Sequence, residues 1–147
     1  MCAPVQFGCE TDVKQYPYDP EKAKALLAEA GYPDGFSVPF HAYRDRAYSE
    51  AVLNDLRAVG IETDLQFLQW RALRPKIVDD EVQIGHLTFG SNGILDVSAS
   101  TSYYFTGGPD DYARDEEVKA WLEEADRTTD QEERKALYSK ALNKIAN

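Results

Sequence analysis

The side chains best suited to hold a small solute follow three apolar stretches of the sequence. They are aromatic or small and polar, and each falls at or just beyond the end of an expected strand: Tyr43, Trp70, Phe89, Gly90, Ser91, Asn92 and Asp96. Aromatic walls with a few polar anchors are typical of binding pockets, whereas bond-breaking needs an activated acid, base or nucleophile. The pattern therefore predicts ligand binding, with core positions for Trp70 and Phe89 as the alternative.

The sequence carries no recognisable catalytic signature. Its two histidines, His41 and His86, fall within expected strands, and the serines between residues 91 and 102 fall in a loop that contains no histidine. Nucleophilic catalysis needs a Ser or Cys held against a base by a third group. The acidic pairs at 79–80 and 110–111 are typical of solvated turns. We therefore expect no catalytic residue and no enzymatic activity.

Cofactor and metal sites are not indicated either. Residues 90–93, GSNG, follow an expected strand, but they lack the third glycine and the downstream Lys-Ser/Thr of a phosphate-binding loop. Cys2 and Cys9 have no histidine close by in the sequence, and two thiols are too few for a zinc site. They would pair in an oxidising compartment and stay reduced in the cytosol, and the sequence leaves both states open. We expect no cofactor and no metal.

Composition limits the partners that the chain can bind. The 147 residues are 43% hydrophobic, enough for one globular domain, and their net charge is −10. Nucleic-acid binding needs a basic face, and an anionic membrane surface would repel this protein. The acidic net charge therefore argues against nucleic-acid binding. No apolar run approaches the roughly 20 residues of a membrane helix, so we expect no membrane insertion either.

Hydrophobic periodicity predicts alternating strands and helices. Strands are expected over 36–43, 61–68 and 82–89, and helices over 20–30, 47–59, 70–78, 115–127 and from Thr129 onwards. The segment 94–112 is expected to be irregular. This order predicts an α/β fold with a narrow, mainly parallel sheet and helices packed on it. Such folds bind ligands beyond the carboxyl ends of their strands.

Local signals define the ends of two of these helices. Asp19 is expected to cap the first helix, Pro20 suits its first turn, and Gly31 supplies a left-handed stop. Thr129 and Glu132 have the spacing of a capping box, so Thr129 is expected to cap the last helix.

One run of the sequence is highly specific. Residues 16–36, YPYDPEKAKALLAEAGYPDGF, resemble the signature in the C-terminal lobe of family 5 extracellular solute-binding proteins. These are the oligopeptide- and dipeptide-binding components of bacterial ABC importers. The resemblance continues at 56–61, 68–70, 110–115 and 125–130. It implies that residues 1–147 are a single domain within the C-terminal lobe of a larger protein, with an extended segment 1–18 and an α/β lobe 19–147.

The resemblance also implies a function. Members are non-catalytic proteins whose two lobes close over a solute, a clamshell of the periplasmic binding protein type II kind. The expected role is capture of a peptide or another small solute for an ABC permease, in the periplasm or outside the cell. The first residues lack a signal peptide, as expected for an excised portion. The alternatives are a receptor for a non-peptide solute and a free-standing interaction module of the same fold that binds a protein partner.

The family pattern assigns roles to individual positions. Trp70 matches a tryptophan that often lines the side-chain pockets. Phe89 takes the place of tryptophan in a Trp-Gly-x-Asp segment, and Gly90 and Ser91 follow it. Asn92 stands where peptide-binding members commonly have an aspartate that pairs with the peptide α-ammonium.

This departure at Asn92 changes the expected chemistry. A neutral amide accepts a hydrogen bond from an ammonium group without the charge that makes such a bond about twice as strong. Asp96, four residues later, is expected to supply that charge if the loop folds back. His86 lies where some peptide binders carry an arginine.

Overall fold

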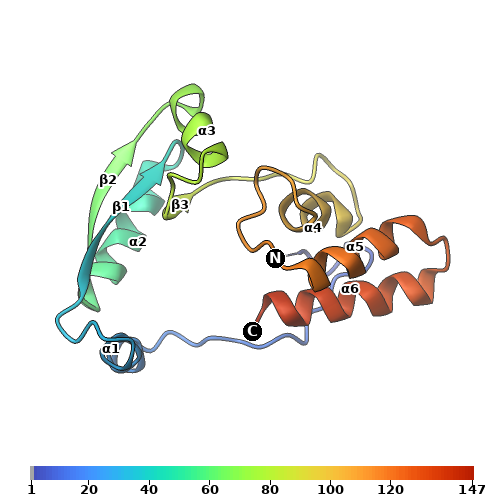
Figure 1. The fold of residues 1–147 in the computed structure, drawn as a ribbon, viewed down its shortest axis with the longest axis horizontal. Coiled ribbons are helices and arrows are strands. Elements are labelled where there is room, and N and C mark those ends of the chain that lie inside the picture. The colour runs from blue at the N-terminus through green and yellow to red at the C-terminus, as the bar shows by residue number, and fades with distance from the viewer. Residues whose placement is uncertain (1) are drawn as a thin grey trace. The chain divides into compact units, whose positions relative to one another are not determined.

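A computed structural model describes residues 2–147, and its contacts divide them into two compact units (Figure 1). We call Pro17–Thr88 the sheet unit. The described residues up to Tyr16, together with Phe89–Asn147, form the helical unit. Each unit has its own core of buried side chains. The expected domain bounds, 1–18 and 19–147, stay a prediction.

The sheet unit contains three parallel strands, as the sequence predicts. They are β1 (Phe36–Ala42), β2 (Ile61–Phe67) and β3 (Ile84–His86), in the order β2-β1-β3. β1 pairs with β2 along its whole length and with β3 only through its last three residues. The sheet is therefore narrow, and all three strands end on the same edge.

Three helices complete the sheet unit: α1 (Pro20–Glu29), α2 (Arg46–Ala58) and α3 (Trp70–Val78). Asp19 caps α1 by accepting a hydrogen bond from the Lys22 amide at 3.0 Å, and Gly31 adopts a φ of +91° just after it. Both features confirm the predicted helix ends. No residue of α1 is buried in this structure, and Leu26 is 53% exposed.

The core of the sheet unit forms two clusters. Phe40 and Ala42 of β1 are buried with Leu53 of α2. Leu73 and Ile77 of α3 are buried with Val82, which leads into β3. Burial of these apolar side chains packs α2 against β1 and packs α3 against the segment that leads into β3.

The third strand is shorter than predicted. Residues 82–89 were expected to be extended, but only Ile84–His86 form a strand. The reason is that β1 ends at Ala42, so nothing remains for residues beyond His86 to pair with. Val82 enters the core beside α3 instead.

The helical unit contains α4 (Ser98–Phe105), α5 (Glu116–Arg127) and α6 (Gln131–Ile145). Val118 and Leu122 of α5 are buried against Tyr138 and Leu142 of α6, with Val97 in the same cluster. The helices over 116–127 and 131–145 confirm the two predicted closing helices.

The expectation that 94–112 is wholly irregular is wrong, because it contains α4. The sequence of α4, SASTSYYF, has weak helix propensity and no amphipathic pattern. Tertiary contacts stabilise it: Thr101 is fully buried, and the side chain of Asp96 accepts a hydrogen bond from the Ser98 amide at 3.0 Å.

The predicted cap of the last helix is one residue off. Asp130, rather than Thr129, is the N-cap of α6, and its carboxylate accepts from the amides of Glu132 and Glu133 at 2.9 and 3.0 Å. A carboxylate is a stronger acceptor than a hydroxyl at the positive end of a helix.

Among residues 2–147, no helix combines the length and apolar character that a bilayer crossing demands.

Candidate functional site

Two of the predicted contact residues lie together at the carboxyl edge of the sheet. Tyr43 follows β1 and Trp70 begins α3 just after β2, so the parallel strands bring both rings to one edge. Their ring centroids are 5.0 Å apart. Trp70 remains 43% exposed, so it is not a core residue. This pair presents a partly exposed aromatic surface where α/β folds bind ligands.

The Tyr43 ring is held in place from the end of the third strand. Its hydroxyl donates to the Thr88 carbonyl at 3.3 Å and lies 2.7 Å from the Thr88 hydroxyl oxygen. The Arg74 guanidinium lies 5.9 Å from the centroid of the Trp70 ring, one turn along α3. These contacts fix the orientation of both rings.

The histidines lie in strands, as predicted, but one has an unforeseen partner. Nδ1 of His86 lies 2.9 Å from the hydroxyl oxygen of Ser49 in α2. A serine beside a histidine has the composition of a nucleophile and its base. Ser49 is fully buried, so its hydroxyl cannot reach a solute in this arrangement. The pair joins α2 to β3.

His41 occupies a buried position in β1. Its Nδ1 atom has no hydrogen-bond partner among the described residues. Burial lowers the pKa of His41, and the charge of Lys76 lowers it further, against smaller opposing effects of the Ile84 backbone and Glu81. His41 therefore favours its neutral form in the folded sheet unit.

Phe89 lies in the helical unit and belongs to a cluster of three rings. Its centroid is 5.1 Å from that of Tyr103 and 5.2 Å from that of Tyr104, both in α4. Phe89 is 44% exposed, so it too is not a core residue. The two tyrosines were not predicted to line a site, and the signal that points to them is the aromatic run at 103–105.

The residues after Phe89 form a tight turn. Asn92 has a φ of +53° and Gly93 a φ of +80°, and the Ile94 amide donates to the Ser91 carbonyl at 3.0 Å. Asparagine tolerates this left-handed conformation better than most residues with a Cβ atom. Asn92 is exposed in this turn.

Asp96 has a structural partner within the helical unit. One oxygen of its carboxylate lies 3.0 Å from the Arg134 guanidinium, and the other accepts from the Ser98 amide. Burial raises the pKa of Asp96, but the Ser98 hydrogen bonds and the charge of Arg134 outweigh it and hold this pKa below its ordinary value. Its carboxylate is therefore ionised and already paired, which leaves less of its charge for a solute ammonium group.

Arg134 links Asp96 to the core of the helical unit. Its guanidinium also donates to the Tyr138 hydroxyl at 2.8 Å and to the Ala125 carbonyl at 2.9 Å. The Tyr138 hydroxyl in turn donates to Asp126 at 2.8 Å. Burial raises the pKa of Tyr138, and the bond to Asp126 adds to the rise. This network anchors the end of the segment that carries Asn92.

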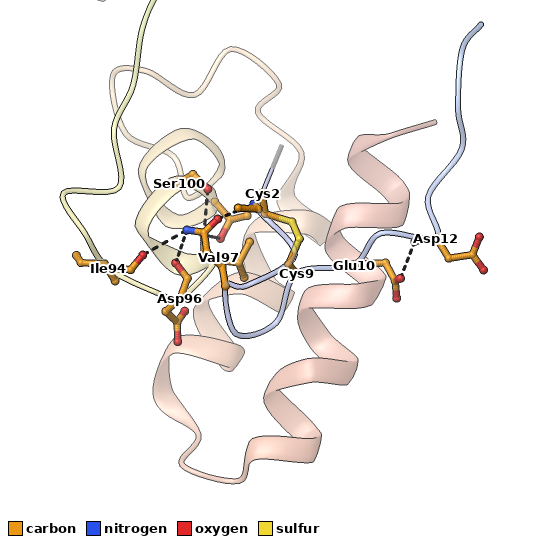
Figure 2. Close-up of a disulfide and its surroundings, with 11 residues drawn as sticks. Cys2, Cys9, Glu10, Asp12, Ile94, Asp96, Val97 and Ser100 are labelled. Atoms are coloured by element: carbon orange, nitrogen blue, oxygen red, sulfur yellow. Dashed lines mark hydrogen bonds between the residues drawn. A yellow bond between two sulfur atoms is a disulfide. The ribbon is translucent and has the colours of Figure 1, made fainter.

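Cys2 and Cys9 form a disulfide in the helical unit (Figure 2). Figure 2 shows this bond beside the segment that carries Ile94, Asp96 and Val97. A hollow of about 390 Å³ lies between the two segments, and it is lined by Cys2, Ala3, Val5, Gln6, Phe89, Ser91, Leu95 and Ser100. Two predicted contact residues, Phe89 and Ser91, thus border a concave surface.

The described residues contain no group of three or more His, Cys, Asp or Glu side chains arranged to hold a metal ion. What the arrangement offers is aromatic surface and neutral polar groups. Such surfaces suit reversible binding of a small solute.

Known structures share this fold along almost the whole chain. The periplasmic binding protein DppA of Helicobacter pylori, solved with the peptide STSA, matches with a TM-score of 0.85 and 26% identity over 98% of this chain and 30% of its own. HbpA2 of Haemophilus parasuis matches with a TM-score of 0.84 and 27% identity over 95% of this chain and 30% of its own. The fold is therefore that of a periplasmic binding protein.

Sequence comparison gives the family. The model of the bacterial extracellular solute-binding proteins, family 5 (middle part), matches residues 2–113, and the chain belongs to this family. Heme-binding protein A of Haemophilus influenzae is 33% identical over 94% of this chain and 27% of its own length. The dipeptide-binding protein of Escherichia coli is 33% identical over 63% of this chain and 19% of its own length. The chain thus spans less than a third of these relatives.

Proposed function

We propose that this chain is the solute-contacting part of a binding protein that captures peptides for an ABC importer. The observation that carries the proposal is the half-exposed Trp70 ring, which packs against the Tyr43 ring at the carboxyl edge of the parallel sheet. A solute that covers an exposed tryptophan removes apolar surface from water, and this burial favours binding. A relative named as a dipeptide-binding protein and a structural neighbour solved with the peptide STSA support a peptide as that solute.

The same proposal assigns the contact residues. Tyr43 and Trp70 in the sheet unit contact apolar parts of the solute. In the helical unit Phe89, Gly90, Ser91 and Asn92 contact it, and Asp96 acts chiefly by holding their segment through Arg134. Asn92 offers a neutral amide, so we propose a preference for solutes that do not depend on a carboxylate at this position.

A non-peptide solute is the second candidate, and one observation favours it. The rings of Phe89, Tyr103 and Tyr104 form a cluster with centroids 4.9–5.2 Å apart, which provides stacking surface for a planar group. A relative named as a heme-binding protein matches 94% of the chain. An interaction module that binds a protein partner is disfavoured, since these relatives carry names of small-molecule binders.

We further propose that the protein acts without catalysis, in the periplasm or outside the cell, and delivers its solute to a membrane permease. The family's extracellular character supports this location. A disulfide suits an oxidising compartment. The burial of Ser49 beside His86 supports a binding role over hydrolysis.

Native mass spectrometry of the full-length protein that contains this chain tests the proposal. The protein should carry a co-purifying peptide, or bind added alanyl-phenylalanine with release of no product. Heme is the competing probe. Binding of heme with no binding of any dipeptide would replace the peptide by the second candidate, and hydrolysis of the dipeptide would reject a binding role.

A further inference from the structure

We propose that the disulfide-closed segment 2–9 positions the candidate binding segment 89–96, with Gln6 as the principal positioning residue. The inference rests on the proposed function, because the segment it concerns is the one proposed to contact the solute. It adds a role for residues near the amino terminus that neither the family pattern nor the sequence periodicity indicates.

Hydrogen bonds connect the two segments directly. The Phe7 amide donates to the Leu95 carbonyl at 2.9 Å, and the Val97 amide donates to the Phe7 carbonyl at 3.0 Å. These two bonds form an isolated parallel bridge between Phe7 and Asp96. The bridge holds the carboxyl end of segment 89–96 against segment 2–9.

Gln6 adds a second connection through its side chain. Its amide nitrogen donates to the carbonyls of Ile94 and Asp96 at 3.3 and 3.4 Å, and its amide oxygen accepts from the Ala3 backbone at 2.8 Å. One side chain therefore closes the turn of its own segment and binds the neighbouring one. A side chain with only a donor or only an acceptor could make one of these two connections but not both.

The segment that Gln6 binds needs external support. Its turn contains two residues with positive φ, Asn92 and Gly93, and lies outside the regular elements. Irregular backbone loses conformational entropy when it is fixed, and contacts from elsewhere must compensate for that loss. Segment 2–9 supplies such contacts next to Ile94, immediately after the turn.

Segment 2–9 is itself held rigid on its other side. The Cys2–Cys9 disulfide closes it into a loop, which restricts its conformations. The ring of Phe7 lies 5.1 Å from the Arg134 guanidinium, which also binds Asp96. Gly8 has a φ of +75° and passes so close to Tyr138 that a Cβ atom would overlap its ring. The loop is therefore fixed to the helical core and can hold another segment.

The hollow between the two segments brings segment 2–9 next to the proposed solute contacts. Val5 is 71% exposed at this hollow, and Phe89 and Ser91 line its other side. The affinity for a solute group that contacts Phe89 would thus depend on the position of segment 2–9, which Gln6 helps to fix.

The test uses the full-length protein that contains this chain, with Gln6→Ala, Gln6→Glu and the control Gln15→Ala. Gln6→Glu keeps an acceptor for Ala3 and removes the donor to Ile94 and Asp96. The Gln15 side chain donates to the Val13 carbonyl within its own exposed segment. For both Gln6 variants we expect about fivefold weaker binding of alanyl-phenylalanine, the change that corresponds to losing a typical hydrogen bond. Hydrogen exchange at the Phe7 and Val97 amides should accelerate by a similar factor, with no change at Leu122.

A second variant, Cys2→Ser with Cys9→Ser, tests the role of the disulfide. We expect faster exchange at Phe7 and Val97 and weaker dipeptide binding than in the oxidised parent. Unchanged exchange in all variants would overturn the positioning role. Faster exchange with unchanged affinity would overturn its link to binding. If the oxidised parent binds neither dipeptide nor heme, the proposed function fails, while the exchange data still decide whether Gln6 positions the segment.

Discussion

The two units place their candidate contact residues by different means. In the sheet unit, Tyr43 and Trp70 stand at the ends of two paired strands, so regular structure sets their positions. In the helical unit, Phe89 and Asn92 stand on irregular chain that is held by ring contacts, an ion pair and a disulfide-closed loop. A strand end can therefore be located from periodicity, whereas the position of a supported loop depends on contacts that are distant in sequence.

The largest expected effect tests whether each unit depends on its own core. Leu122→Ala removes a fully buried side chain from the helical unit and should cost about 3 kcal/mol of its stability. Amides of α5 and α6 should then exchange faster, with little change at Ala42 in β1. Leu73→Ala should accelerate exchange in the sheet unit, with little change in α5 and α6. Leu26→Ala, at a 53% exposed site, should change exchange in neither unit. Equal loss of protection in both units from either core variant would show a single cooperative core.

The next effect concerns the strand-end aromatic pair. Trp70→Ala should weaken solute binding by about 1.5–2 kcal/mol, because the solute loses the apolar surface that it covers. Isothermal titration calorimetry of the full-length protein measures this change. Tyr48→Ala, which removes an aromatic ring that is 72% exposed on α2, is the control and should leave the affinity unchanged. An unaltered affinity in the Trp70 variant would remove Trp70 from the site.

A smaller effect is expected at the turn of the helical unit. Asn92→Asp should increase affinity for dipeptides with a free α-ammonium over their N-acetylated forms by about tenfold, because the hydrogen bond gains a charge. Aspartate tolerates the left-handed conformation of Asn92, so the turn should persist. Asn54→Asp adds the same charge on α2 and should not alter this preference. No change in preference for Asn92→Asp would place the ammonium group elsewhere.

The smallest expected effects concern the pH dependence of stability, which should differ between the two units. His41 has a pKa below 6.5 in the folded state because of burial, so the unfolded chain binds its proton more tightly. Its contribution to stability is complete above pH 6.5 and is lost as the pH falls through the lowered pKa. The pKa of Asp96 lies below 3.8, because its hydrogen bonds and Arg134 outweigh the effect of burial, so its contribution is lost only as the pH falls below about that value.

Hydrogen exchange at pH 7 and pH 5 checks this difference. The sheet unit should lose protection between these values, and the helical unit should keep it. His41→Gln should flatten the response of the sheet unit, and Asp96→Asn should flatten only the response of the helical unit at still lower pH. A parallel loss in both units at pH 5 would contradict the assignment to His41.

The sequence was most informative where local chemistry decides structure. Asp19 and Gly31 mark the ends of α1, and alternation along 61–67 locates β2. It was least informative where burial decides structure. The weak helix former SASTSYYF becomes α4 because Val97 and Thr101 are buried, and β3 is short because β1 ends at Ala42. The length over which two strands pair and the burial of a side chain depend on other parts of the chain, so a single segment does not predict them.

The same limit applies to the candidate site. Tyr43 and Trp70 could be predicted as strand-end rings because their positions follow from β1 and β2. The pairing of Asp96 with Arg134, 38 residues away, was not foreseen, and neither were the contacts of Gln6 with Ile94 across 88 residues. Side-chain partners at such separations depend on how the helices pack, which the local pattern does not specify.

Fluorescence of Trp70 tests the central proposal, that this ring contacts the captured solute, most directly. The chain has two tryptophans, so Trp121→Phe in the full-length protein leaves Trp70 as the only reporter within these residues, and Trp70→Phe provides the reciprocal control. We predict that saturating alanyl-phenylalanine shifts or quenches the Trp70 emission and leaves that of Trp121 unchanged. An emission from Trp70 that stays constant while calorimetry shows the dipeptide bound would contradict the account.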